Sequence, residues 1–180
     1  MKKATLWLAE TAAMLATLIV IQAVTKPAGQ LVTGTLVNAV LGITTLVCGK
    51  RSGAVVALLS PVMAFLLNIA PQVLTVPAIM AGNLVFVLIL GILAKRPLRV
   101  WNCILWGVTA AAAKFVVLYL LVVQGICHLA AGQLLEKGLL KLPMLGVLTQ
   151  TFTWPQLITA LLGVTITLWV APLLRKALHR

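Results

Sequence analysis

The chain of 180 residues is 62% hydrophobic and 9% charged, with a formal net charge of +12 and a mean hydropathy of +1.15. This composition has too few polar residues to cover a water-soluble surface, so it excludes an ordinary soluble domain and predicts a polytopic membrane protein. The positive charge does not indicate a nucleic-acid partner, because the basic residues lie in short clusters between apolar runs. The acidic residues are Glu10 and Glu136, so paired-carboxylate catalysis and carboxylate metal centres are not expected.

Hydropathy and helix-breaking residues predict an all-α integral membrane protein, a bundle of six membrane-spanning helices in one domain covering residues 1–180. Each span is close to the roughly 17–25 residues that a hydrocarbon core requires. The predicted spans are 4–24, 31–48, 53–69, 76–94, 99–124 and 152–174. The first apolar run follows Lys2 and Lys3 and continues through Val24, so we interpret it as a retained helix rather than a cleaved signal peptide.

Residues 125–150 form the one long predicted connection. Leucines alternate with charged and amide side chains between His128 and Leu142. This pattern suits a short amphipathic helix that lies on the membrane surface or covers a pocket, and an ordinary surface loop is the alternative.

The distribution of lysine and arginine predicts the orientation of the bundle. If the N-terminus is cytoplasmic, ten basic residues lie on the inner side and three, Lys26, Lys137 and Lys141, lie on the outer side. Cytoplasmic loops carry an excess of lysine and arginine, so both termini are predicted to be cytoplasmic.

Lys114 is the one basic residue that the pattern places well away from both ends of a span. A charged side chain at membrane depth costs about 2.5–3.5 kcal/mol on insertion scales, so it normally faces a bundle interior or a watery cavity. Gly107, Ala110 and Ala111 share its helix face, and small residues allow neighbouring helices to approach closely. We therefore expect Lys114 to face inward, the alternative being a side chain that extends to a lipid headgroup.

Three amide side chains are expected at the level of Lys114. A rise of 1.5 Å per residue places Lys114 about 22 Å above the start of its helix, in the outer half of the membrane. Asn38, Asn83 and Gln156 are predicted at a similar level on three other helices, with Tyr119, Phe152 and Trp154 as aromatic walls. These residues predict a pocket for a small molecule, and the Lys114 ammonium would favour a carboxylate or another anionic group on it. The alternative for each amide is that it connects helices.

Polar and small residues form two further stripes. Thr35, Asn38, Gly42 and Thr45 lie on one face of the second span. A corresponding stripe on the last span comprises Gln156, Thr159, Ala160, Gly163 and Thr167. Both stripes are expected to face protein rather than lipid.

Ala9, Ala12, Ala13 and Ala16 form one face of the first span, in overlapping patterns of two alanines separated by three residues. Such a face favours close packing of helices, either within this chain or against a partner.

Together with six spans in about 180 residues, these features resemble the S-components of energy-coupling factor (ECF) vitamin transporters, which bind the substrate. That family uses an alanine face on its first helix to contact a shared transmembrane coupling subunit. Four short stretches are also similar to bacterial members of the family: TGTLVN at 33–38, LSP at 59–61, GNLV at 82–85 and WPQL at 154–157.

The resemblance implies a subunit of a bacterial cell membrane that captures a vitamin or related micronutrient from outside. Transport would require the coupling subunit and two ABC-type ATPases. The chain has no phosphate-binding loop of the form G-x-x-x-x-G-K-[ST], which agrees with energy supplied by partners. Biotin, pantothenate, lipoate, niacin and folate carry carboxylates, whereas other cargoes of the family, such as cobalamin and queuosine, remain open.

Two alternatives belong to other classes. The first is a membrane scaffold or assembly factor that binds a partner through its first helix and has a structural lysine. The second, an intramembrane enzyme, lacks a plausible catalytic constellation, so no enzymatic activity, cofactor or metal is predicted.

Overall fold

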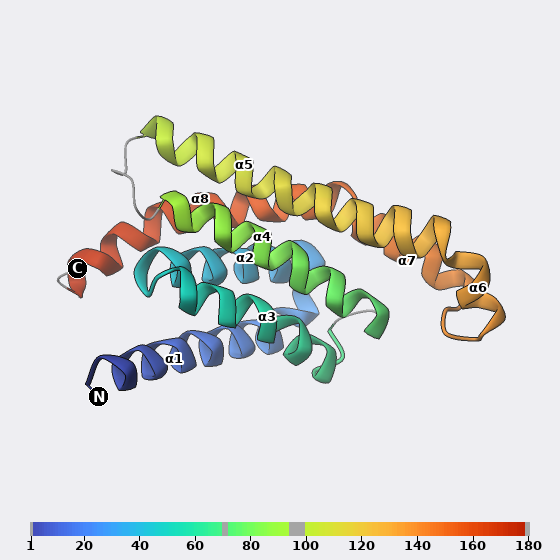
Figure 1. Ribbon diagram of the computed structural model, residues 1–180, viewed down its shortest axis with the longest axis horizontal. Helices are drawn as coiled ribbons and strands as arrows, with labels where there is room; N and C mark the ends of the chain where they lie inside the picture. Colours follow the sequence, from blue (N-terminus) through green and yellow to red (C-terminus); the bar gives the residue numbers. More distant parts are fainter. Residues whose placement is uncertain (1, 70–71, 94–99, 179–180) are drawn as a thin grey trace.

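The computed structural model describes residues 2–69, 72–93 and 100–178, and these residues form a bundle of helices (Figure 1). The long helices are α1 (Lys2–Thr25), α2 (Gln30–Val47), α3 (Lys50–Leu66), α4 (Val76–Leu93), α5 (Val100–Leu118) and α8 (Trp154–Ala177). The shorter helical elements are η1 (Lys26–Ala28), η2 (Val73–Thr75), η3 (Tyr119–Leu129), α6 (Ala131–Glu136) and α7 (Leu142–Thr151). Lys95, Arg96 and Arg99 lie outside the described residues, as do Pro71, Pro97 and Arg180.

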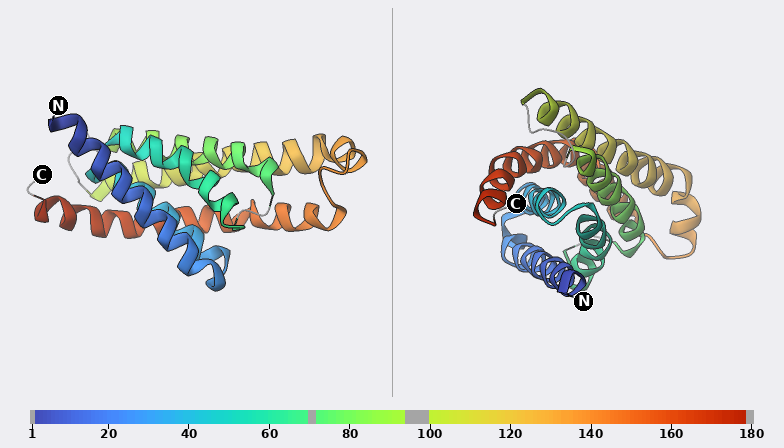
Figure 2. Two further views of the ribbon diagram at one scale, coloured as in Figure 1. Left: turned by 90° about the horizontal axis from the view of Figure 1, so that it is seen from below. Right: turned by 60° about the vertical axis from the view of Figure 1, so that its left-hand side comes forward.

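Five helical stretches are long and apolar enough to cross a membrane, as a multi-pass membrane protein requires. They are Lys3–Ala28, Gln30–Val47, Val73–Leu93, Trp101–Leu129 and Leu142–Ala177. The remaining predicted span corresponds to α3, which is shorter, at 17 residues, and contains Pro61. The first and last helical residues lie at the same end of the bundle (Figures 1 and 2).

Helix α2 is the centre of the bundle and packs against α1, α3, α4 and α8. The two predicted stripes meet there, since Asn38 and Gly42 of α2 are buried together with Gly163 and Thr167 of α8. A Cβ at Gly163 would lie 2.9 Å from the carbonyl oxygen of Thr35 and 3.0 Å from the backbone nitrogen of Ala39. Glycine therefore lets the two backbones come this close, which confirms that these stripes face protein.

The turn from α2 to α3 depends on Gly49. Its φ of 96° lies in the left-handed region that favours glycine. The turn at Gly49 directs α3 back along the bundle.

Helix α1 lies on the outside of the bundle and crosses the other helices obliquely (Figure 2). It packs against α2 and α3, and Thr11 donates a hydrogen bond of 2.8 Å to the Ser52 hydroxyl. The four alanines of the predicted docking face, Ala9, Ala12, Ala13 and Ala16, are all exposed. This face is therefore not used for packing within the described part of the chain.

The long predicted connection at 125–150 is mostly helical, and α6 lies within the stretch where a short amphipathic helix was one of the two expectations. The helix expected to end at 124 continues in π geometry to Leu129, and α6 and α7 follow it. The helix continues because Val122, Val123 and Cys127 are buried together with Leu148. These residues belong to an apolar cluster separate from the main core of the bundle, which we call the second apolar cluster. As Figure 1 shows, this hairpin extends beyond the ends of the other helices.

Candidate ligand site

Lys114 enters the bundle interior from the buried face of α5. Gly107, Ala110 and Ala111 on this face are buried, and a Cβ at Gly107 would collide with Val164 of α8. This close approach of α5 to α8 leaves the Lys114 side chain only 3% exposed. The inward orientation predicted from the small residues is confirmed.

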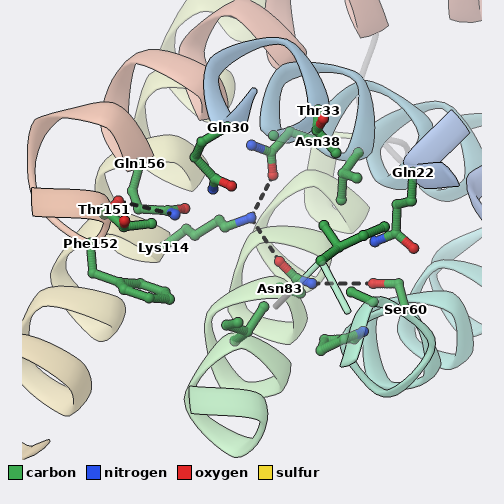
Figure 3. A pocket seen from close by; sticks show the side chains of 16 residues that line it. Gln22, Gln30, Thr33, Asn38, Ser60, Asn83, Lys114, Thr151, Phe152 and Gln156 are labelled. Carbon is green, nitrogen blue, oxygen red and sulfur yellow. Dashed lines mark hydrogen bonds between the residues drawn. The ribbon is translucent and has the colours of Figure 1, made fainter. Parts of the chain in front are cut away.

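Two asparagines hold the ammonium group. The Nζ atom donates to Oδ1 of Asn38 at 2.5 Å and to Oδ1 of Asn83 at 2.7 Å, so α5 is joined to α2 and α4 (Figure 3). The ring centroid of Phe86 lies 5.6 Å from Nζ. An ammonium has three N–H donors, and the two asparagine oxygens accept from two of them.

Hydroxyl groups orient the asparagine amides. The Nδ2 atom of Asn83 donates to Ser60 Oγ at 3.4 Å, and the Nδ2 atom of Asn38 donates to Thr159 Oγ1 at 3.5 Å. Because both amide nitrogens have acceptors, both Oδ1 atoms are directed at Lys114. Asn38 and Asn83 therefore connect helices, which is one of the two roles expected for them. They also line a cavity, which is the other.

A cavity of about 80 Å³ lies beside the ammonium. Its lining includes the four predicted polar residues Lys114, Asn38, Asn83 and Gln156. A second hollow of about 220 Å³ shares part of this lining and adds Lys26 and Asn68. The two hollows share Gln30, Thr33, Ile69 and Thr151, so they lie next to each other.

The cavity has a buried basic group and no acidic one. The chain has two carboxylate side chains, Glu10 on α1 and Glu136 on α6, and neither lines the cavity. Uncharged amide oxygens only partly replace the hydration that a buried ammonium loses. The site is therefore electrostatically incomplete, and an anionic group placed beside Lys114 would complete it.

Two of the three predicted aromatic walls lie elsewhere. Trp154 is 70% exposed and stacks on Phe115 on the outside of α5. The Tyr119 hydroxyl accepts a hydrogen bond of 2.9 Å from Gln124 Nε2, and its ring packs on the second apolar cluster. Neither lines the cavity, because similar depth on a helix does not fix the direction of a side chain. Phe152, the third predicted aromatic wall, is 2% exposed and does line the cavity.

Sequence reasoning missed several polar lining residues, namely Gln22, Gln30, Thr33 and Thr151. Gln22 could have been predicted as a lining residue, because it is an amide within an apolar helix, as Asn38 and Asn83 are. Residues 128–142, predicted as a possible cover, do not line the cavity. The end of α7 and the turn into α8 take this place through Thr151 and Phe152.

Comparisons with known proteins give no further assignment: no protein-family model, curated protein or solved structure matches the chain. In the part of the chain that the structure describes, no three His, Cys, Asp or Glu side chains gather as a metal site.

Proposed function

We propose that the chain is the substrate-binding subunit of an ECF-type importer and that it captures a small anionic micronutrient. The observation that carries the proposal is the buried Lys114 ammonium, held by two amide oxygens in a cavity whose described lining contains no carboxylate. A charge of this kind inside a membrane bundle usually marks a ligand or ion site. Amide and hydroxyl groups around it favour a small polar ligand over a bare ion.

The proposed arrangement has six crossings, with α3 as the shortest, in a bacterial cell membrane. An even number of crossings agrees with helix ends that lie together (Figure 1), and the excess of basic residues favours a cytoplasmic position for that end. The second hollow, lined by Lys26 and Asn68, then faces outward. A ligand from outside would pass Lys26 before it reaches Lys114.

The alanine face of α1 is the proposed docking surface for the transmembrane coupling subunit. Ala9, Ala12, Ala13 and Ala16 are exposed, and their small side chains permit close approach of another helix. The proposed partners also include two ABC-type ATPases, which would supply the energy for release of the ligand.

Affinity purification from membranes of the native host tests this proposal. The tagged chain is expected to recover a coupling subunit and ATPases, and Ala13→Trp is expected to lose them because the indole blocks close approach. Val24→Trp is the matched control, since Val24 is 71% exposed and lies about 16 Å further along the same helix. Both variants are expected to retain bound ligand.

Recovery of other membrane proteins without ATPases or a small molecule would favour a scaffold and contradict the proposal. Loss of ligand together with partners in Ala13→Trp would show that the alanine face supports the fold of the chain instead.

A further inference from the structure

Gln22 is a buried polar group that the fold does not satisfy. It lies in the outward half of α1, is 4% exposed, and its Oε1 atom has no hydrogen-bond partner. Leaving a buried amide oxygen unpaired costs about 1–3 kcal/mol, so such atoms are uncommon and require a reason. Thr35 Oγ1 is the other buried unpaired atom among the described residues, but it does not line the cavity.

The position of Gln22 in the cavity gives a reason for its unpaired amide oxygen. It lines the same cavity as Lys114 and is the one residue of α1 that does so. Figure 3 shows its amide on the α1 side of the cavity, away from Gln156 and Thr151, with the Lys114 ammonium between them. The cavity therefore contains the cationic group of Lys114 and, separately, the amide of Gln22, which can both donate and accept hydrogen bonds.

We propose that Gln22 binds a hydroxyl or amide group of the ligand whose anionic group is bound by Lys114. This inference rests on the proposed function and narrows the ligand to an acid with a second, hydrogen-bonding group at a distance from the first. A hydroxyl or amide suits Gln22 because each can donate to Oε1 and accept from Nε2. An apolar ligand end would leave Oε1 unpaired in the complex as well.

The test uses straight-chain ω-hydroxycarboxylates of increasing length and, for each, the alkanoate in which a methyl group replaces the hydroxyl. Binding to the purified full chain in lipid nanodiscs is measured by titration calorimetry. We expect at least one hydroxy acid to bind about twofold to tenfold more tightly than its matched alkanoate, as one hydrogen bond contributes. Gln22→Met, which removes the amide at similar length, should abolish this preference but retain binding of the alkanoates.

Gln133→Met is the matched control, because Gln133 is exposed on α6, outside the cavity. This variant should retain the preference for the hydroxy acid. The unliganded Gln22→Met protein should unfold at a temperature no lower than the wild type, because the substitution removes an unpaired oxygen. A lower unfolding temperature would identify Gln22 as a structural residue and overturn the inference.

The remaining outcomes separate this inference from the proposed function. Carboxylate binding that depends on Lys114 but shows no preference for a hydroxyl, or a preference that survives in Gln22→Met, overturns the role of Gln22 alone. Failure of the wild type to bind any of the acids, or equal binding by Lys114→Met, contradicts the anion site and with it both proposals.

Discussion

Replacing Lys114 with methionine removes the charge and keeps a side chain of similar length. Two unit charges about 4 Å apart attract by about 4 kcal/mol at an effective dielectric constant near 20. Since about 1.4 kcal/mol corresponds to a tenfold change, we expect Lys114→Met to weaken binding of an anionic ligand by about a thousandfold.

The same substitution is expected to leave the protein folded. Asn38 and Asn83 would each have an unpaired Oδ1 atom, at about 1–3 kcal/mol apiece. Loss of the buried charge removes a desolvation penalty of several kcal/mol, which opposes that cost.

The assay is calorimetric titration of the purified chain in nanodiscs with the compound that co-purifies with the wild type, together with thermal unfolding of each variant. Lys137→Met is the matched control, because Lys137 is exposed and lines neither hollow. It should have a much smaller effect on affinity. Equal affinity in wild type and Lys114→Met would refute the reasoning, as would a Lys114→Met chain that does not fold.

Three further predictions follow from the packing around the site. Asn83→Leu should weaken ligand binding by about tenfold, the value of one hydrogen bond to a charged group, because Lys114 loses an acceptor; unchanged affinity in the titration would exclude Asn83 from positioning it. Gly163→Val should lower the unfolding temperature because its Cβ meets the backbone of α2, whereas Gly146→Val, where a Cβ has nothing within 4 Å, should not; similar stability of the two variants would contradict the packing of α2 on α8. Trp154→Leu should leave ligand affinity unchanged, since Trp154 stacks on Phe115 outside the cavity. A clear loss of affinity in this variant would show that Trp154 contributes to the ligand site.

The predictable part of the structure comes from periodicity. Gly107, Ala110 and Lys114 recur at helical spacing, and this spacing is enough to direct Lys114 inward. The stripe containing Asn38 and the stripe containing Gly163 were predictable for the same reason, because polar and small residues on one face of an apolar helix require a protein neighbour.

The unpredictable part depends on how helices are rotated and tilted against one another. Tyr119 is close to Lys114 in depth but about 140° around an ideal helix, so a similar level did not bring it to the cavity. Gln22 reaches the cavity because α1 crosses the bundle obliquely (Figure 2), and this angle is a property of the packed helices. The sequence of the 125–150 region does not predict how far its helices extend, because its apolar side chains are interrupted by glycines and charges and become buried only where Leu148 packs against η3.

Mass spectrometry of the small molecules that co-purify with the chain is the most direct test of an anion site at Lys114. We expect an anionic compound with a hydroxyl or amide group, bound to the wild type and absent from Lys114→Met prepared in the same way. A cationic or uncharged compound, or the same compound retained at equal occupancy by Lys114→Met, would contradict this expectation.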